Sequence, residues 1–311
     1  MSVEQLKEHT VAAIDVTGLR KAYGPLTAVD GLDLTVEAGE VVALLGPNGA
    51  GKTTTVEILE GYRRRDAGDV RVLGTDPEKG GRALRERIGV VLQEAGFEES
   101  FTPRELIRLH AGYYPHPRPV DEVIALTGLG EKADARVRTL SGGQRRRLDL
   151  ALGIVGGPEL IFLDEPTTGF DPSARRHAWE LVDGLRDLGA TILLTTHYLD
   201  EAEHLADRVV IIDHGRVVAA GTPASLSAGS GTVISFRLPP GVATADLPVV
   251  GRDRRVAGSV VEVHTGSATA DVAALSTWAV ARGIELEELT LARPSLEDVY
   301  LGIVGEAEVV A

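Results

Sequence analysis

One stretch near the N-terminus decides the fold: Val41-Val42-Ala43-Leu44-Leu45-Gly46-Pro47-Asn48-Gly49-Ala50-Gly51-Lys52-Thr53. Its first five residues are all apolar, which is typical of a strand buried on both faces. The glycines that follow let successive backbone N–H groups point at phosphate oxygens, and the next helix adds the positive end of its dipole. Strand, loop and helix in this order predict a phosphate-binding loop at the edge of a parallel sheet.

The side chains of this loop suit a nucleoside triphosphate. Lys52 is expected to reach the β and γ phosphates, and the Thr53 hydroxyl is expected to bind Mg²⁺. A chain of this composition matches the eight-residue pattern by chance about 0.01 times, which leaves a glycine-rich turn with an exposed lysine as the weaker alternative. The expected ATP contacts of the loop are Gly46, Pro47, Asn48, Gly49, Ala50, Gly51, Lys52, Thr53 and Thr54.

Composition narrows the class of protein. The 311 residues indicate about two domains, and 43% hydrophobic with 4% aromatic residues fits an α/β protein. The 32 Lys and Arg against 46 Asp and Glu give a net charge of −14, which repels polyanions, so nucleic acid is not expected as a partner. The absence of cysteine excludes disulfides, thiolate metal sites and cysteine nucleophiles.

The sequence also bears on location. No apolar run approaches the ~20 residues of a membrane helix, and Met1–Gln5 lacks the basic start of a signal peptide. We therefore expect a cytoplasmic protein whose connection with a membrane runs through another polypeptide.

Two further apolar runs end in polar residues. Leu160–Leu163 leads into Asp164 and Glu165, and Thr191–Thr196 leads into His197. Open parallel sheets bind their ligands at the carboxyl ends of the strands. We therefore expect the acidic pair and His197 to lie beside the phosphate-binding loop.

Adjacent side chains on an extended strand end diverge, so Asp164 and Glu165 are assigned different tasks. Asp164 is expected to hold Mg²⁺, and Glu165 is expected to polarise or deprotonate the attacking water. The alternative is that the pair caps the helix that follows Pro166-Thr167-Thr168.

Three single residues have weaker signals. His197 is expected to hydrogen-bond the γ-phosphate, although a surface histidine is the usual alternative. Gln93 ends the strand-like run Ile88–Leu92 and is expected to offer an amide oxygen to Mg²⁺, with exposed polar filler as the alternative. For Tyr23, stacking on adenine and ordinary half-buried packing remain equally open.

A second glycine element, Leu140-Ser141-Gly142-Gly143-Gln144, opens a predicted helix. It lies too far along the chain to belong to the first loop, and a helix start is itself an anion site. This indicates a site shared between two subunits, the alternative being a capping serine with a flexible Gly-Gly. The basic triplet Arg145-Arg146-Arg147 is interpreted as a solvated helix face that supports phosphate or acidic neighbours.

The chain divides by its patterns into two parts. Residues about 98 to 155 have helical spacing and few strand signals, which predicts a helical insertion. Ser225–Gly231 has the composition of a linker. Strand-like Val233–Phe236 and Val260–Val263, a helix near Val272–Ala281 and a strand near Leu286–Leu291 complete a small α/β domain.

Taken together, these motifs resemble the nucleotide-binding subunit of ATP-binding cassette (ABC) transporters over residues 14–222. The resemblance implies a P-loop NTPase (RecA-like) core with an N-terminal antiparallel β subdomain, so that the domains are 1–222, with the helical part at about 98–155, and an accessory 223–311. The matched positions are Leu140–Gln144 for the signature, Gly46–Thr53 for Walker A, Leu160–Glu165 for Walker B, Gln93 for the Q-loop, His197 for the switch histidine and Tyr23 for adenine stacking.

In that family two cassettes hold two ATP molecules between them. The resemblance therefore implies a homodimer in which Ser141, Gly142, Gly143 and Gln144 of one subunit contact the nucleotide bound by the other. It also implies that Asp171 lies in the subunit contact, where Phe170 replaces the usual leucine. ATP and Mg²⁺ are the implied cofactors.

Three segments narrow the resemblance to ATP-binding proteins of drug exporters, especially of the daunorubicin/doxorubicin-resistance type: Gly46–Thr55, Leu140–Leu150 and the tail Pro294–Leu301. This type implies export of a drug or antibiotic through a separate transmembrane permease, with the chain peripheral on the cytoplasmic face of the cell membrane. Gly96, Phe97 and Phe101 are expected to contact a short helix of the permease. The alternatives are a soluble non-transport ABC ATPase and the ATPase of an importer.

Overall fold

The computed structural model describes residues 12–91, 96–228, 231–292 and 295–301. By its internal contacts the chain forms two compact units, Met1–Ala220 and Gly221–Ala311. The first unit contains two sheets and the second contains one.

The first unit is built on a six-stranded sheet of order β5-β6-β7-β3-β8-β9. The strands β5 to β8 in this order pair in parallel. Continuous apolar runs predicted the three strands that matter for the site, and their bounds agree within one residue. The strands are β5 Ile88–Val91, β6 Leu160–Asp164, β7 Thr191–Thr196, β3 Val41–Leu45, β8 Arg208–Asp213 and β9 Arg216–Gly221.

The register of this sheet aligns the ends of its central strands. Leu45 of β3 pairs with Thr196 of β7, and Asp164 of β6 pairs with Thr195 of β7. The segments that follow β3, β6 and β7 therefore leave the sheet at one edge, where open parallel sheets place their ligands.

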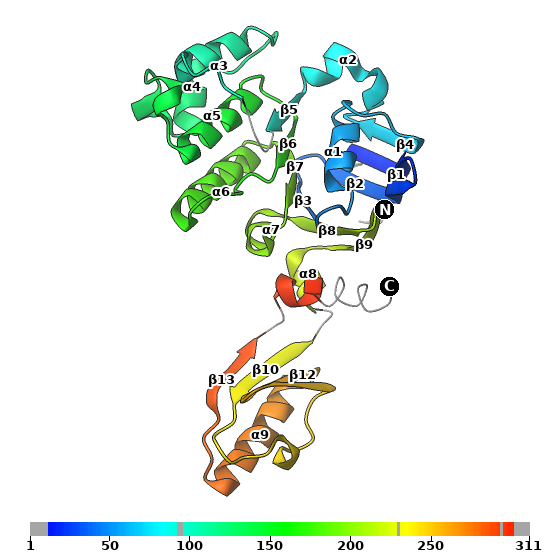
Figure 1. Cartoon of the computed structure of the whole chain (residues 1–311), viewed down its shortest axis with the longest axis vertical. Helices are drawn as coiled ribbons and strands as arrows, with labels where there is room; N and C mark the ends of the chain where they lie inside the picture. Colours follow the sequence, from blue (N-terminus) through cyan, green and yellow to red (C-terminus); the bar gives the residue numbers. More distant parts are fainter. Residues whose placement is uncertain (1–11, 92–95, 229–230, 293–294, 302–311) are drawn as a thin grey trace, which may run out of the picture. The chain divides into compact units, whose positions relative to one another are not determined.

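A smaller antiparallel sheet of order β2-β1-β4 covers one side of this core. Helix α1 (Lys52–Leu59) lies between the two sheets (Figure 1), and its Val56 and Ile58 are buried in a cluster with residues of both. The antiparallel strands are β1 Ala12–Tyr23, β2 Leu26–Glu37 and β4 Ala67–Val72, and β4 is followed by helix α2 Pro77–Arg85.

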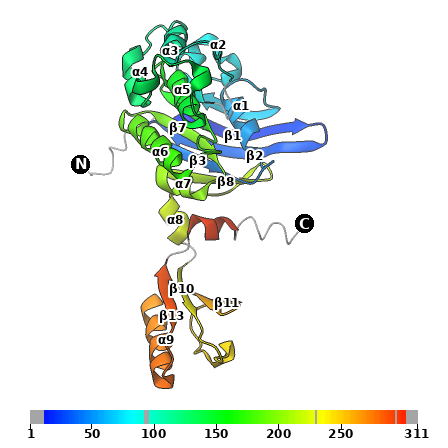
Figure 2. The same cartoon turned by 60° about the vertical axis from the view of Figure 1, so that its left-hand side comes forward.

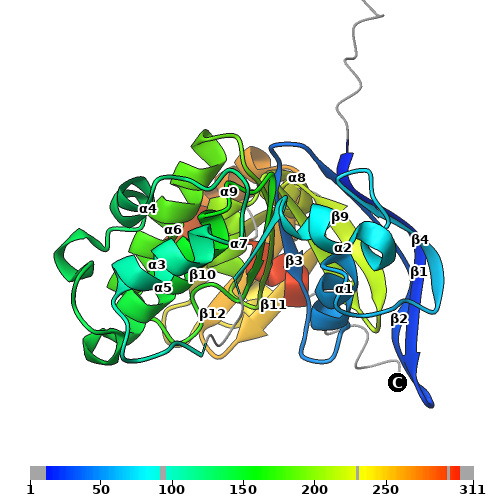
Figure 3. The same ribbon diagram turned by 90° about the horizontal axis from the view of Figure 1, so that it is seen from above.

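Helices α3 (Pro103–Ala111), α4 (Val120–Leu126) and α5 (Gly142–Ile154) pack on one another within the range expected for a helical insertion. Seen from above in Figure 3, they lie on the opposite side of the six-stranded sheet from β1, β2 and β4. α3 and α5 each begin with a capping box, at Thr102 and Ser141. In each box the hydroxyl accepts a hydrogen bond from the amide three residues later, and the side chain of that later residue accepts one from the amide of the capping residue. Two 3₁₀ turns, Gly130–Lys132 and Val137–Thr139, join α4 to α5.

Two more helices complete the first unit. Helix α6 (Pro172–Asp187) follows β6, and helix α7 (Leu199–Leu205) follows β7. α7 contacts β3, β7 and α6. The turns that start α6 and α7 therefore adjoin the site edge of the sheet.

The second unit is a four-stranded antiparallel sheet of order β11-β12-β10-β13 with helix α9 (Ala268–Arg282) packed on one face (Figure 2). The predicted small α/β domain is confirmed in its elements, with β11 as an additional strand. The strands are β10 Thr232–Arg237, β11 Asp253–Ala257, β12 Val260–Thr265 and β13 Glu287–Ala292.

The interpretation of Ser225–Gly231 as a linker is wrong in its first half. Residues Pro223–Ala228 form helix α8. The Thr222 hydroxyl accepts a hydrogen bond from the Ser225 amide at 3.0 Å, so Thr222 caps a helix whose first residue is proline. Residues 229 and 230 lie outside the described residues.

Candidate nucleotide site

The loop after β3 is packed tightly against its own chain. A Cβ on Gly46 would lie 2.2 Å from the Ile212 carbonyl oxygen, and a Cβ on Gly51 would lie 2.2 Å from that of Ala28. Gly51 also has φ +100°, a conformation that L side chains rarely adopt, and it caps α1 without a side-chain hydrogen bond. Glycine is therefore required here by the fold itself.

Lys52 is buried, with 7% of its surface exposed. Its Nζ donates hydrogen bonds to the carbonyl oxygens of Gly46 at 2.7 Å and Pro47 at 3.1 Å, so the ammonium group is held inside the loop. Burial lowers the pKa of this ammonium, and Glu165 and Asp164 oppose the effect. These two carboxylates are therefore close enough to share one electrostatic site with the loop.

Asp164 ends β6 and is tied to the neighbouring strand. One of its carboxylate oxygens accepts a hydrogen bond from the Thr195 hydroxyl of β7. The same hydroxyl accepts a bond from the Glu165 amide at 3.2 Å. One threonine thus fixes both members of the acidic pair.

Glu165 departs from the extended strand end that the sequence suggested. Its φ is +45°, a left-handed conformation that is uncommon for a residue with a side chain. This conformation, and not the alternation of a strand, separates its side chain from that of Asp164. Such strained residues persist where their surroundings hold them, often at functional sites.

His197 follows β7 and contacts the same glutamate. Its Nδ1 lies 3.3 Å from Glu165 Oε1, while Glu165 Oε2 accepts a hydrogen bond from the Thr168 hydroxyl at 3.0 Å. The expectation that Glu165, His197 and Lys52 lie together thus agrees with the geometry. A water between Glu165 and a phosphate would be within reach of a general base.

Thr53 is exposed on the first turn of α1, and Thr54 beside it is half-buried. Hydroxyl and carboxylate oxygens are the donors that Mg²⁺ prefers, so Thr53 with Asp164 fits that ion chemically. Gln93, the third expected ligand, lies outside the described residues.

Tyr23, the residue expected beside adenine, ends β1. The residue is 37% exposed, and its ring has two cations nearby, Lys21 Nζ at 5.5 Å and Arg63 Cζ at 5.3 Å from the centroid. A ring that attracts cations on its faces also suits a stacked base.

The second glycine element starts α5 with a self-contained cap. The Gln144 amide donates to Ser141 Oγ at 3.3 Å, and the Ser141 amide donates to Gln144 Oε1 at 3.0 Å. A Cβ on Gly142 would have no neighbour within 4 Å, and a Cβ on Gly143 would meet only Ala174 Cβ at 3.9 Å. Nothing within the described chain requires glycine at these two positions.

A cleft of about 720 Å³ lies at the start of α5. Ser141 and Gly143 line it together with Glu165, Phe170 and Asp171, whereas none of the described residues 46–53 does. Asp171 also caps α6, because its Oδ1 accepts a hydrogen bond from the Ala174 amide at 2.9 Å. Within one chain, then, the two glycine elements do not share this cleft.

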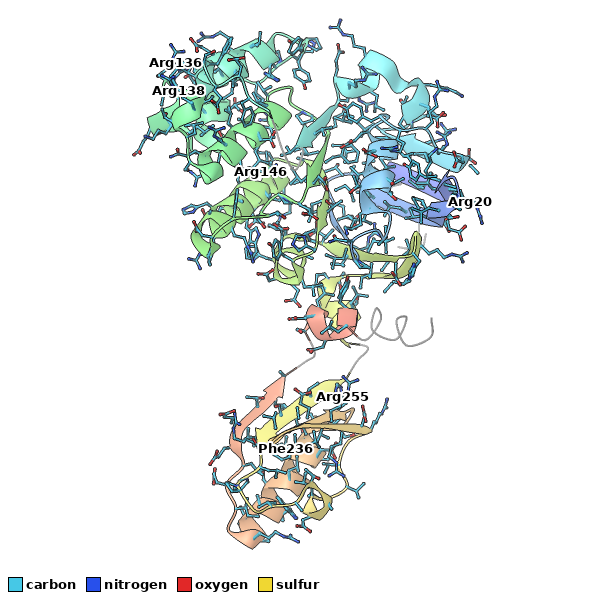
Figure 4. The ribbon with its side chains drawn as sticks, in the orientation of Figure 1. Arg20, Arg136, Arg138, Arg146, Phe236 and Arg255 are labelled. Atoms are coloured by element: carbon cyan, nitrogen blue, oxygen red, sulfur yellow. The ribbon has the colours of Figure 1, made fainter. Side chains whose placement is uncertain are left out.

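Sequence reasoning missed the role of Arg146. Its neighbours Arg145 and Arg147 are partly exposed as expected, but Arg146 is buried and forms an ion pair with Asp149 at 2.9 Å. Figure 4 shows it where α5 approaches the six-stranded sheet. Burial raises the pKa of Asp149 to about 6, and Arg146 opposes the rise. An acid three residues after a basic one was the only signal in the sequence.

Glu60 is a second buried acid that the sequence did not reveal. It caps the C-terminal end of α1 and is 6% exposed. Burial raises its pKa to about 8, with further contributions from Asp164 and Glu57. The carboxyl group of Glu60 therefore keeps its proton to a higher pH than an exposed glutamate does.

Arg175 on α6 links that helix to the segment after β7. Its guanidinium lies 4.2 Å from the ring centroid of Tyr198 and donates to Asp200 Oδ2 at 2.9 Å. The Tyr198 ring in turn lies 4.1 Å from that of His197. The ring of His197 thus packs against Tyr198, and the guanidinium of Arg175 lies against the ring of Tyr198.

Similarity to known proteins agrees with this geometry. The sequence profile of ABC transporters matches residues 29–168, and that of the ABC transporter domain-containing protein-like C-terminal domain matches residues 232–295. The daunorubicin resistance ATP-binding protein DrrA3 of Streptomyces coeruleorubidus is 41% identical over 94% of this chain and 96% of that relative. The chain belongs to the ABC transporter family.

Two further likenesses support the ABC assignment. The Nod factor export ATP-binding protein I of Paraburkholderia xenovorans is 40% identical over 94% of this chain and 97% of that relative. A solved ATP-binding subunit of an ABC transporter superposes with a TM-score of 0.63 and 28% identity over 70% of this chain and 92% of that one. The predicted P-loop NTPase fold and ABC-type ATP hydrolase are therefore confirmed. None of the helices in the described residues is both long and apolar enough to cross a membrane.

Proposed function

We propose that this ABC ATPase drives export of a drug-like molecule through a separate transmembrane permease, by closing and opening a homodimer around ATP. The observation that carries the proposal is the contact of Glu165 with His197 at the sheet edge that also bears the Lys52 loop. The relatives named for daunorubicin resistance and Nod factor export support the direction of transport.

In the proposed site the loop Gly46–Thr53 binds the phosphates of ATP. Lys52 exchanges its two carbonyl partners for the β and γ phosphates, a trade that charge-assisted hydrogen bonds favour. Thr53, Asp164 and Gln93 would hold Mg²⁺, and the ion would supply positive charge that neutralises the phosphates. Thr54 and the backbone amides of the loop complete the grip, and Tyr23 stacks on the adenine.

Glu165 accepts a proton from the attacking water in this scheme. The Thr168 hydroxyl and the His197 ring both contact its carboxylate and orient it. When ATP is bound, His197 hydrogen-bonds the γ-phosphate, so one imidazole reports the presence of that phosphate to the base.

The γ-phosphate also requires a second chain. In the proposal, the helix start of a partner copy approaches this phosphate with Ser141, Gly142, Gly143 and Gln144. These residues have room for a ligand. They also line a cleft that the phosphate-binding loop of the same chain does not line. Asp171 would lie in the same subunit contact. Hydrolysis removes these contacts, and the dimer opens.

The permease is proposed to dock in a groove of about 590 Å³. Gly96 and Phe97 line it with the exposed side chains of Tyr62 and Leu109, which suits the apolar face of a short helix. Phe101 lines a neighbouring pocket with Arg136 and Arg138. Through the permease the chain would be peripheral on the cytoplasmic face of the membrane.

The domain boundary belongs to the proposal as well. Residues 1–222 would form the nucleotide-binding domain and residues 223–311 the accessory domain, in keeping with a division of internal contacts between Ala220 and Gly221. The profile matching residues 232–295 supports a separate role for the second part.

Replacing the proposed base tests the mechanism. Glu165→Gln keeps the shape of the side chain but removes its basicity, so ATP binding should persist while turnover falls by about 100-fold or more and ATP-bound dimer accumulates. Steady-state phosphate release and size-exclusion chromatography with ATP measure both effects. Glu131→Gln, on an exposed turn, is the matched control. Wild-type turnover of Glu165→Gln would refute the role.

Dilution tests the shared site. The rate per chain should fall as the protein is diluted below the concentration at which it dimerises, because each site needs two copies. Undiminished activity of monomeric protein with Ser141 and Gly143 replaced would exclude the scheme.

The docking groove is tested by co-purification with the transmembrane permease that this chain drives in the proposal. Phe97→Ala and Phe101→Ala should weaken association and uncouple ATP hydrolysis from transport. Normal association and normal transport would discard the groove, without affecting the assignment of Glu165.

A further inference from the structure

Arg146 makes a set of contacts that the proposed ATPase cycle does not use. From α5 its guanidinium donates to the carbonyl oxygens of Pro166 at 3.1 Å and Asp164 at 2.9 Å, with Glu165 O at 3.4 Å. Its remaining edge donates to Asp149 at 2.9 Å. One buried side chain on the signature helix thus binds three successive carbonyl groups around the hydrolytic glutamate.

The neighbouring arginines do nothing comparable. Arg145 pairs with Glu99 at 3.3 Å, and Arg147 approaches the Gly128 carbonyl oxygen at 3.4 Å, so both contact the helical part itself. Figure 4 sets Arg146 apart from Arg136 and Arg138, which lie on the outer side of that part. Arg146 contacts the six-stranded sheet through the Asp164 carbonyl oxygen of β6.

The chemistry of these contacts requires arginine. A guanidinium is planar and carries five N–H donors in fixed directions, so it can bind several carbonyl oxygens and a carboxylate at once. Asp149 supplies the opposite charge, which makes burial of the cation tolerable. A lysine ammonium could keep the charge but could not span the same set of acceptors.

The backbone at Glu165 needs such support. Its φ of +45° is a conformation that lasts only when neighbouring groups hold it. On the amide side, the Glu165 N–H donates to Thr195 O at 3.0 Å and contacts the Thr195 hydroxyl. On the carbonyl side, the acceptors around Glu165 are bound by Arg146. Strand β7 and helix α5 therefore both hydrogen-bond to the backbone at Glu165, β7 at its amide and α5 at the carbonyl groups around it.

We propose that Arg146 is a positioning residue for Glu165 and couples the signature helix to the hydrolytic site of its own chain. The proposal rests on the proposed role of Glu165 as the base. When the γ-phosphate of ATP bound by a partner copy contacts Ser141 at the start of α5, a shift of this helix changes the position of Glu165 through Arg146. ATP bound in one site is thereby sensed at the base of the other site.

The test replaces Arg146 with methionine, which keeps length but removes every donor. The turnover number of the full-length chain should fall on the order of 10- to 100-fold, because a displaced base loses alignment with its water. The dissociation constant for ATP should stay within about twofold, since the hydrogen bonds of Arg146 named above are to Asp149 and to the carbonyl groups of residues 164–166. Hydrogen exchange should quicken at the Glu165 amide and its neighbours.

Arg108→Met on α3 is the matched control, because it removes an equal charge from an exposed position of the helical part and should change turnover by less than about twofold. Adding Arg146→Met to Glu165→Gln should lower the residual rate no further, since both act through one group. A merely structural role would give additive losses and weaker ATP binding.

Arg146→Lys decides the matter if the methionine variant does not fold. It keeps a cation beside Asp149, and its turnover should still fall on the order of 10-fold. Turnover within about twofold of Arg108→Met in either folded variant overturns the coupling role. If Glu165→Gln itself hydrolyses ATP at the wild-type rate, the proposed function fails instead, so the two failures are distinguishable.

Discussion

At the start of α1 a Cβ on Gly51 would strike a backbone carbonyl oxygen at 2.2 Å, whereas at the start of α5 a Cβ on Gly143 would meet only a methyl group at 3.9 Å. Both helices begin at glycine-rich elements, but only the first needs glycine for its own packing. The cap differs too, because α1 has no side-chain hydrogen bond at its start and α5 has a complete capping box.

The contrast separates two demands on a phosphate site. The loop before α1 leaves its helix amides without a side-chain cap and surrounds a buried lysine, so its form is dictated from within the chain. At the start of α5 the side chains of Ser141 and Gln144 already accept hydrogen bonds from the first backbone amides. Open space remains beside Gly142 and Gly143. Glycine without an internal reason points to something that approaches from another molecule.

The largest effect should follow from Gly51→Ala. The left-handed backbone costs about 1–2 kcal/mol and the collision with Ala28 about 1–3 kcal/mol, so the free energy of unfolding should fall by about 4 kcal/mol. Urea denaturation measures it. Gly49→Ala is the control, because Gly49 has φ +84° but no neighbour within 4 Å. This variant should lose only the cost of the left-handed backbone, about 1–2 kcal/mol. Equal losses would show that packing does not shape the loop.

Lys52→Met comes next. Charge-assisted hydrogen bonds from a buried ammonium contribute about 3 kcal/mol, so the affinity for ATP should fall about 100-fold. Titration with a fluorescent ATP analogue measures it, and Lys132→Met on an exposed turn is the control. An affinity within a few-fold of wild type would remove the distinction between the loop and the start of α5.

Each helix also buries one acid, and the pH dependence of stability compares them. Glu60 on α1 has its pKa raised from 4.5 to about 8, so the folded chain keeps a proton that the unfolded chain releases above its lower pKa. The free energy of unfolding should therefore fall as pH rises through this window, by about 2 kcal/mol after allowance for partial solvation. Glu60→Gln should remove this slope.

Asp149 on α5 serves as the comparison for Glu60. Burial raises its pKa from 3.8 to about 6, and Arg146 opposes part of the rise. Its contribution should accordingly be lost over a lower and narrower range of pH than that of Glu60. Thermal melts of Asp149→Asn and Glu60→Gln across this range measure both, and coincident profiles would contradict the assignment.

The smallest effect on free energy should come from Gly143→Ala. Alanine favours the helix by about 0.5 kcal/mol over glycine and fits beside Ala174, so the variant should melt no lower than wild type. ATP turnover should nevertheless fall about 10-fold, which is about 1.4 kcal/mol, because the methyl group faces the partner's phosphate. A stable variant with full activity would show that no second chain approaches α5.

The sequence predicted the parts of this molecule that follow from unambiguous patterns. β3, β6 and β7 are continuous apolar runs, and each is followed by the residues of the candidate site, so their convergence at one edge could be expected. Alternation of apolar and polar residues in Ile14–Leu19 and Leu32–Val36 also predicts two half-buried strands, which lie within β1 and β2. Their lengths were underestimated, because β1 and β2 extend past the alternating core into exposed ends.

The remainder depended on contacts that no local pattern encodes. Arg146 lies in a basic triplet and looks solvated until β6 is placed beneath it. The left-handed φ of Glu165 arises from hydrogen bonds to β7 and α5, which are distant in sequence. α8 was hidden by the Ser- and Gly-rich composition of Ser225–Gly231, although Thr222 followed by Pro223 was a usable signal for a helix start.

The backbone of Glu165 bears on how this enzyme responds to engineering. Glycine would adopt φ +45° freely, so Glu165→Gly should relieve about 1 kcal/mol of conformational cost. A selection for heat resistance alone would thus favour loss of the very side chain proposed to activate water. Thermal stability and catalysis therefore make opposite demands on residue 165. Variants of this chain are best screened for both properties together.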